Sequence, residues 1–451
     1  IKSQETIPMA RSVCFSDLPP EVLIDIIHAV RSLPGIHWDH VSRQRMRDKC
    51  VKITDPESEK VYEIYPDDGL PILNTLQALA VVSRNLYQVS RPILWKHLAF
   101  PSFVPGPMDI WTKSILPRNG HLVQTLAIPI SNNCDTLAEE LSPELWHKLI
   151  YENAAPELVQ ERFRNYATHE YLSAYSVYRL LSECFNIHTL TIQFRTREDG
   201  NPPRNLQRFL VRLIPLISDL KSLRHLIINY HGSPVVMNEF LIQTLRQLPL
   251  LRSFACGALQ TSRGLAHKLF GYHCSQLRHL SQLKLTRLAH IDESWCLYNW
   301  PSNLTELALG LARDTQLQME LVCRFINHVG SNLTKLQLDL NGPHHNLDPE
   351  KVCFDLPMLT NLSLSCEDPV SLVCFQEFKT LQTLEHCYLD WTQWYIINDL
   401  ICNLTWPCLQ SISISSWITH KTGPELAKYA AGVDKLIEFC DENGIKNSII
   451  V

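Results

Sequence analysis

One pattern of apolar and variable positions, the repeated phrase, recurs along the chain from residue 187 onward. An apolar residue is followed by two variable residues, a second apolar residue, one variable residue and a third apolar residue. The last three positions alternate with a period of two, which is typical of a strand with one buried face. We therefore predict one strand in each copy, with its variable side chains on the opposite face. The nine copies begin at Ile187, Leu223, Leu251, Leu280, Leu304, Leu333, Leu359, Leu384 and Leu409.

The spacing of these copies resembles that of leucine-rich repeats. From Leu223 onward, successive copies begin 24 to 29 residues apart, and leucine-rich repeats have periods of about 20 to 29 residues. The resemblance implies an α/β solenoid with parallel strands on the concave side and helices on the convex side. The asparagine expected after the phrase is present at Asn341 but is largely absent elsewhere. We therefore expect an irregular array.

Segments between the strands have helical periodicity. Helices are predicted over 238–248 and 319–329, and an earlier strand is predicted over 123–128. Three further helices, over 142–151, 156–167 and 170–184, would form a helical insertion within residues 134–185. After the last copy, Pro424 to Asn443 is amphipathic, and Gly444 follows as a stop signal. This last helix is expected to cover the exposed end of the array.

Two apolar stripes at helical spacing lie near the N-terminus. The first helix would be capped by Ser16 or Asp17, with Pro19 or Pro20 in its first turn. Its stripe consists of Leu18, Val22, Leu23, Ile26, Ile27 and Val30. The second stripe consists of Leu76, Leu79, Ala80, Ser83, Leu86 and Tyr87, and Ile93, Leu94 and Trp95 follow Pro92. Such short helices bury little surface alone, so part of this apolar face is expected to meet the rest of the chain or a partner.

These helices resemble an F-box in the Leu-Pro-Pro-Glu start at Leu18, the Val-Ser-Arg triplet at Val82 and the Leu-Trp pair at Leu94. The resemblance implies docking on the Skp adaptor of a cullin-based ubiquitin ligase. The residues expected at the adaptor are Leu18, Pro19, Val22, Leu23, Ile26, Ile27, Leu79, Val82, Leu86, Leu94 and Trp95. The alternative is that they begin a larger helical domain. The chain departs from the family at Leu86, where members often carry Trp, and at the inserted segment 34–71.

The inserted segment has a pattern of its own. Residues 51–54 and 61–65 alternate like strands around Asp55-Pro-Glu-Ser, which predicts a two-stranded hairpin. A basic run over 43–49 is surrounded by acidic residues. This mixture is typical of a solvated face, so we do not expect the run to bind nucleic acid.

Composition narrows the class of protein. The 451 residues have a formal net charge of −5, which argues against a nucleic-acid or membrane-surface protein. We see no apolar run of about 20 residues, the length that a membrane helix requires. The fifteen cysteines are odd in number and spread along the chain, which favours free thiols in a reducing compartment, in the cytoplasm, the nucleus or both. The four Asn-Leu-Thr or Asn-Leu-Ser triplets are interpreted as repeat turns rather than glycosylation sites. They begin at Asn303, Asn332, Asn361 and Asn403.

No catalytic or metal-binding motif is found in the sequence. No Cys-x-x-Cys pair is present, so we expect no metal, no cofactor and no intrinsic catalysis. A protein substrate would bind the variable positions of the concave face, with Trp391 as an aromatic anchor unless it packs between repeats. The other candidates are Thr334, Lys335, Gln337, Thr360, Asn361, Gln410 and Ser411.

Together the two resemblances imply the substrate-recognition subunit of an SCF-type ubiquitin ligase, with a Skp adaptor, a cullin and a protein substrate as partners. The alternative is a leucine-rich-repeat scaffold or GTPase regulator that acts without ubiquitination. The expected organisation is a tail (1–14), an F-box with its insertion (15–100), a leucine-rich-repeat solenoid (101–420) and a capping helix with a tail (421–451).

Overall fold

The computed structural model divides the chain into two compact units. The first comprises 1–98, 105–124 and 139–169, and the second comprises 99–104, 125–138 and 170–451. The structure describes residues 18–32, 51–54, 61–64, 80, 82–99, 111–130, 174–194, 206–230, 234–257, 265–312, 318–340, 345, 347–366, 368–387, 394–403, 406–415 and 424–450.

The second unit alternates strands with helices. Its strands are β4 (Thr125–Ile130), β5 (Thr189–Phe194), β6 (His225–Tyr230), β7 (Ser253–Cys256), β8 (Gln282–Leu288), β9 (Glu306–Leu311), β10 (Lys335–Asp339), β11 (Asn361–Ser365), β12 (Thr383–Cys387), β13 (Ser411–Ser415) and β14 (Lys446–Ile450). Its helices are α9 (Ala174–Glu183), α10 (Leu206–Asp219), α11 (Pro234–Gln247), α12 (Leu265–Ser275), α13 (Met319–Val329), α14 (Trp394–Cys402) and α15 (Pro424–Glu442), with the short 3-10 turns η4 (Glu293–Leu297), η5 (Gly330–Asn332) and η6 (Pro369–Phe375).

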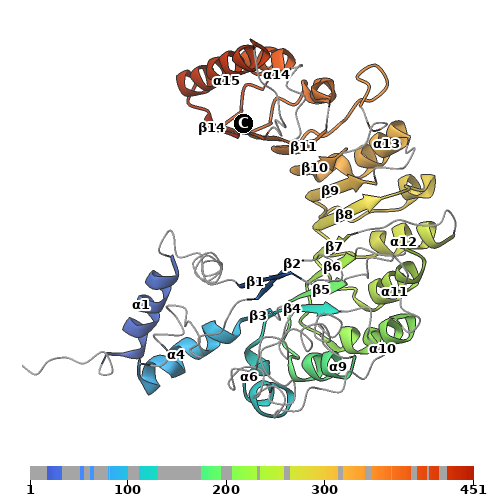
Figure 1. Ribbon diagram of the computed structural model, residues 1–451. Coiled ribbons are helices and arrows are strands. Elements are labelled where there is room, and N and C mark those ends of the chain that lie inside the picture. Colours follow the sequence, from blue (N-terminus) through green and yellow to red (C-terminus); the bar gives the residue numbers. More distant parts are fainter. Residues whose placement is uncertain are drawn as a thin grey trace, which may run out of the picture. The chain divides into compact units, whose positions relative to one another are not determined.

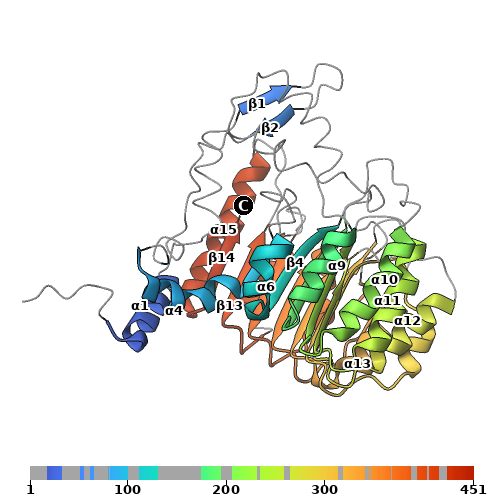
Figure 2. The ribbon, with the colours of Figure 1, turned by 90° about the horizontal axis from the view of Figure 1, so that it is seen from below.

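Strands β4 to β14 stand in sequence order in one sheet. Every pairing from β4 to β14 is parallel. Helices α9 to α13 lie along one face of the sheet in both views (Figures 1 and 2). The fold class is therefore α/β, with a parallel sheet and a solenoid-like succession of strand and helix.

The core of this unit is built by the apolar positions of the repeated phrase. The second apolar residue of each phrase lies beside its equivalent in the next strand, and so does the third. Both rows are buried; the first includes Leu283, Leu307, Leu336 and Leu362, and the second includes Leu285, Leu309, Leu338 and Leu364. Because each strand buries one face only, stacking of neighbouring strands is what closes the core.

Eight of the nine predicted phrases match a strand in the expected register, and so does the earlier phrase over 123–128, which forms β4. The phrase assigned to Leu384 was wrong. In β12, Leu384 pairs with Leu362 and His386 pairs with Leu364, so the phrase begins three residues earlier, at Leu381. A buried histidine occupies the third apolar position, and this polar residue hid the correct register.

His386 is buried without full hydrogen bonding. One ring nitrogen, Nδ1, lies 2.9 Å from the carbonyl oxygen of Leu364, and the other, Nε2, has no hydrogen-bond partner. Burial lowers the pKa of this imidazole to about 4, although the contact with Leu364 acts in the opposite direction. The folded protein therefore holds His386 in its neutral form.

His386→Leu is expected to remove one pH-dependent loss of stability. An unfolded histidine has a pKa of about 6.5, so the unfolded chain takes up a proton that folded His386 refuses as the pH falls from about 6.5 to about 4. The wild type should lose about 3 kcal/mol over this range through His386. Denaturant unfolding of both proteins at a series of pH values measures the difference. Equal losses in wild type and variant would contradict the assignment, and the exposed His279→Leu is the matched control.

The predicted helices agree closely with those of the structure where the apolar stripe is long. Helix α13 covers the predicted 319–329. Helix α15 ends near Gly444, which has a φ of +68° and so adopts the left-handed conformation that favours glycine. The predicted tail after it contains the strand β14, which pairs with β13. The end of the sheet is thus extended by a strand rather than covered by a helix alone. Residues 142–151 and 156–167 lie outside the described residues.

An aromatic cluster fills the core between α12, η4 and α13. The Trp295 ring is fully buried and lies 6.0 Å from the Phe270 ring, 6.2 Å from the Trp300 ring and 5.5 Å from the Phe325 ring, measured between centroids. Gly271 of α12 faces the same ring, and a Cβ atom at this position would collide with it. The glycine therefore allows the helix to approach the tryptophan closely.

The first unit contains α1 (Pro20–Ser32), β1 (Val51–Thr54), β2 (Val61–Ile64), α4 (Arg84–Trp95), η2 (Trp111–Ile115), α6 (Leu116–Asn119) and η3 (Gly120–Leu122). Strands β1 and β2 form the predicted hairpin and are antiparallel. Helices α1 and α4 pack against each other. The predicted second helical stripe is broken at Ser83, whose side chain caps α4 by accepting a hydrogen bond from the Leu86 amide at 3.2 Å.

Helix α4 is also anchored within the first unit. The Arg91 side chain donates from Nε to Oδ1 of Asn119 at 2.8 Å, and its guanidinium donates to the carbonyl oxygen of Arg118. The Trp95 ring meets the Trp111 ring edge-on at 6.3 Å. These contacts hold the end of α4 against α6 and η2.

Candidate functional site: the open face of the sheet

The face of the sheet that points away from the two core rows is called the open face. Two rows of its side chains line the site, and a third row, at the strand ends, includes Asp339, Ser365, Cys387 and Ser415. The first row contains Ser253, Gln282, Glu306, Lys335, Asn361, Thr383 and Ser411. The second row contains Ala255, Lys284, Ala308, Gln337, Ser363, Glu385 and Ser413. Small residues at many of these positions leave the face hollow.

A groove of about 520 Å³ lies in this hollow and crosses the strands from β6 to β12. Residues of both rows line it, from Ile227 on β6 at one end to Glu385 on β12 at the other. Ala255, Ala308 and Ser363 of the second row have small side chains, which leave the volume of the groove open. A volume of this size suits several residues of an extended chain or a small molecule.

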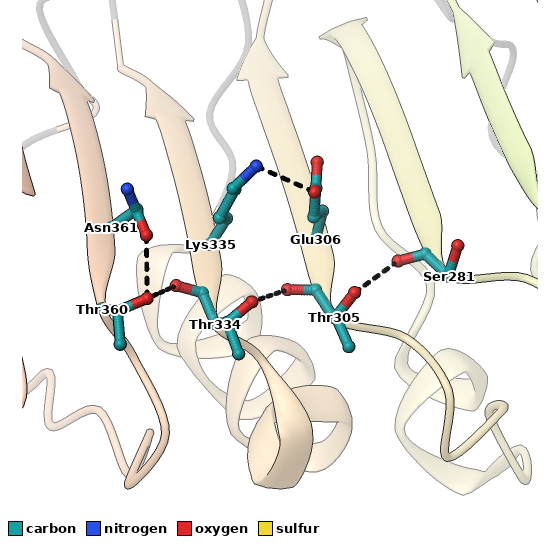
Figure 3. A network of polar contacts seen from close by, with 7 residues as sticks. All are labelled: Ser281, Thr305, Glu306, Thr334, Lys335, Thr360 and Asn361. Carbon is teal, nitrogen blue, oxygen red and sulfur yellow. Dashed lines mark hydrogen bonds and ion pairs between the residues drawn. The ribbon is translucent and has the colours of Figure 1, made fainter.

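One edge of the open face is fixed by a ladder of side-chain hydroxyls (Figure 3). The Ser281 hydroxyl donates to the carbonyl oxygen of Arg252 at 3.1 Å, Thr305 to Ser281 at 3.3 Å, and Thr334 to Thr305 at 3.2 Å. Thr360 Oγ1 lies 3.1 Å from the carbonyl oxygen of Thr334 and 2.8 Å from Oδ1 of Asn361. Its single hydrogen serves one of these acceptors at a time.

The same carbonyl oxygens accept backbone hydrogen bonds from the following repeat. The amides of Thr334 and Lys335, for example, both donate to the carbonyl oxygen of Thr305, at 2.9 and 3.0 Å. The hydroxyl ladder therefore links consecutive repeats, as an asparagine ladder would. Sequence reasoning missed this role because it looked for asparagine after the strand rather than hydroxyls before it.

Charges that line the groove fall into a paired centre and two ends. In the centre, Lys335 Nζ lies 3.0 Å from Oε1 of Glu306 (Figure 3). Lys284 on β8 and Glu385 on β12 are exposed, and neither forms an ion pair within the described part of the chain. These two side chains therefore remain available to a ligand.

The predicted substrate-binding residues divide into three groups. Thr334 and Thr360 are half-buried and belong to the hydroxyl ladder, so their hydroxyls are already engaged. Lys335, Gln337 and Asn361 line the groove. Two lie elsewhere: Gln410 is exposed beside β13, and Ser411 Oγ donates to Thr383 Oγ1 at 3.2 Å. Trp391 lies outside the described residues.

Sequence reasoning did not select Lys284, Glu306 or Glu385, although they occupy variable positions of predicted strands. The signal for Lys284 and Glu306 was their alternation with buried leucines, which places them on the open face. Glu385 was obscured by the register error at Leu384. Trp406, just before β13, is buried and donates from Nε1 to the carbonyl oxygen of Phe375 at 2.9 Å.

The predicted adaptor residues also separate by exposure. Leu23, Ile27 and Leu86 are buried on helices α1 and α4, which pack against each other. Val22 and Val82 are exposed at 41% and 65%. Pro19 is exposed, and Leu18, Ile26, Leu94 and Trp95 are half-buried. Leu79 lies outside the described residues.

The described thiols are free, and several of them are unreactive because they stay protonated. Burial raises the pKa of Cys256, Cys184 and Cys366 to about 12, so these groups stay protonated at neutral pH. A protonated, buried thiol is a poor nucleophile and a poor metal ligand. Within the same described ranges, no cluster of three or more His, Cys, Asp or Glu side chains could hold a metal ion.

A comparison of the chain with protein-family models finds no match, and a comparison with curated proteins finds none either. None of the helices that the structure describes is both long and apolar enough to cross a membrane. The site is therefore assigned from its own geometry: a hollow, mixed-charge surface on a parallel sheet, suited to binding.

Proposed function

We propose that the protein is the substrate-recognition subunit of an SCF-type cullin ubiquitin ligase. In this proposal the α1–α4 pair acts as an F-box that docks on a Skp-type adaptor, and the parallel sheet with its helices is a leucine-rich-repeat solenoid that holds a protein substrate. The observation that carries the proposal is the coexistence of two features: F-box-like phrases around a helix pair that leaves Val22 and Val82 exposed, and a groove on the open face of the sheet.

The protein would promote ubiquitination by proximity and would itself form no bond. A substrate held in the groove is kept close to a conjugating enzyme recruited by the cullin, which raises the effective concentration of its lysines. Neutral buried thiols and a groove lined by hydroxyls, amides and one ion pair support a binding role. The proposal places the protein inside the cell.

The adaptor surface would centre on the outward side of α1 and the start of α4. Val22 and Ile26 lie four residues apart, so they share one side of α1, and Leu18 precedes the helix. Their side lies next to the buried stripe of Leu23 and Ile27. Ile24 is also exposed, at 40%, but it follows Val22 by two residues and so points about 160° away from it.

Val22→Asp combined with Val82→Asp is expected to weaken adaptor binding by about tenfold to a hundredfold, since each change removes apolar contact and places a carboxylate in the interface. Both residues are exposed in the free chain, so folding should be unaffected. Titration of the purified full chain with a Skp-type adaptor measures the effect. Ile24→Asp is the matched control and should bind like the wild type. Unchanged affinity in the double variant would contradict the proposed surface.

A further inference from the structure

The distribution of charge in the groove indicates what kind of segment binds there. Four of the residues that line the groove have a formal charge at neutral pH: Lys284 on β8, Glu306 on β9, Lys335 on β10 and Glu385 on β12. Between them, Glu306 and Lys335 neutralise each other. The groove is therefore positive at its β8 end and negative at its β12 end.

These two end charges lie in the same row, which fixes their separation. Lys284 pairs in register with Ala308, Ala308 with Gln337, Gln337 with Ser363, and Ser363 with Glu385. Four inter-strand spacings of about 4.8 Å place the two backbones about 19 Å apart. An extended peptide advances about 3.3 Å per residue, so it covers this distance in about six residues.

The floor between the two charges suits an extended backbone. Ala308 and Ser363 are small, and Gln337 between them is exposed and offers an amide that can both donate and accept. Gln282 and Asn361 in the first row offer two further amides along the same groove. Such amides can form hydrogen bonds with the backbone of a peptide of any sequence. The charges of Lys284 and Glu385 then select which sequences bind.

The surroundings reinforce the positive end. Arg252, exposed just before β7, occupies the position that Ser281, Thr305 and Thr334 hold in the hydroxyl ladder. The pKa of His225, in the first row on β6, is lowered by burial and then by the positive charge of Arg252 and by His188. At the equivalent positions before β12 and β13, the chain has the neutral residues Gln382 and Gln410.

We propose that the groove binds an extended protein segment that crosses the strands and carries an acidic and a basic residue about six positions apart, the acidic one over Lys284 and the basic one over Glu385. The inference rests on the proposed function only in taking the occupant to be a substrate protein. The charges themselves give the segment its direction across the sheet.

Selection of a random dodecapeptide library on the purified full chain tests this inference. Enriched peptides are expected to share an acidic and a basic residue with about five residues between them. Lys284→Glu combined with Glu385→Lys should weaken the selected peptides about tenfold or more, because two attractive pairs become repulsive. A synthetic peptide with its acidic and basic residues exchanged should bind this swapped variant better than it binds the wild type.

The matched control exchanges two exposed charges on α15, Lys435→Glu with Glu438→Lys, and like the test variant it keeps the net charge. The control should bind the selected peptides like the wild type, and thermal melting should show both variants folded. Three results would overturn the inference: no enrichment, enrichment without the charge pair, or failure of the exchanged peptide to recover binding. Adaptor binding by the same variants separates the two proposals, because it depends on residues of the first unit and not on Lys284 or Glu385.

Discussion

Trp295→Ala should lower the free energy of unfolding of the repeat unit by about 3 to 5 kcal/mol, the cost of deleting a fully buried aromatic side chain. Trp295 contacts Phe270 of α12, Trp300 and Phe325 of α13, so its loss opens a cavity shared by neighbouring repeats. Because Gly271 holds the helix close to this ring, the surrounding backbone has little room to collapse into the space. Denaturant unfolding followed by far-UV circular dichroism measures the loss.

Leu297→Ala is the control for this prediction, because Leu297 belongs to the same short turn η4 but is 80% exposed. Its replacement should change stability by less than about 0.5 kcal/mol. Similar stability of the two variants would show that the aromatic cluster is not the core that its geometry implies.

Leu23→Asp combined with Ile27→Asp should disrupt the α1–α4 pair. Both leucine and isoleucine are buried in that pair, and each loses about 1.5 to 3 kcal/mol of apolar burial before the cost of a buried carboxylate is added. Hydrogen exchange should become fast across α1 and α4, whereas the strands β7 to β11 should keep their protection. Adaptor binding should also be lost, but here through loss of structure.

The exposed pair Val22→Asp and Val82→Asp provides the comparison for this double variant. It should leave hydrogen exchange in α1 and α4 at the wild-type rate, and it should weaken binding to the adaptor. If Leu23→Asp with Ile27→Asp kept these helices protected, the buried assignment of the two residues would be contradicted.

Sequence periodicity predicted most of the sheet because its strands repeat one pattern. Each copy puts leucine or a similar residue at fixed positions, and burial of one face then fixes the register, since a shift of one residue would expose the core. The prediction failed at β12 because His386 interrupts the pattern, and Cys387 and Leu389 supply a false one. Strand β14 was missed because Asn447 stands in its buried row and no leucine begins the phrase.

The N-terminal helices show a different limit of sequence reasoning. An apolar stripe identifies which residues can be buried, but it does not say whether another helix or a partner covers them. Leu23 and Ile27 are covered by the chain itself, whereas Val22 is not. The break at Ser83 was missed because serine lies in the middle of a continuous stripe, and only its extended backbone, with φ −153° and ψ 158°, reveals it as a cap.

The candidate site was predictable in its location but not in its details. The alternation of the phrase placed Lys335, Gln337 and Asn361 on the open face, and the groove includes all three. The hydroxyl ladder and the ion pair between Lys335 and Glu306 depend on contacts between residues about 25 to 30 positions apart, which follow from the stacking of repeats rather than from any local motif.

The central claim is that the chain joins a cullin ubiquitin ligase through its N-terminal helices, and co-purification from cells tests it most directly. The full chain and a chain lacking residues 1–100 would be purified by the same tag, and the bound proteins identified by mass spectrometry. The proposal predicts a Skp-type adaptor and a cullin with the full chain and neither with the shortened one. Recovery of the full chain with other partners but without adaptor or cullin would contradict it, and would favour a scaffold or GTPase regulator that acts without ubiquitination.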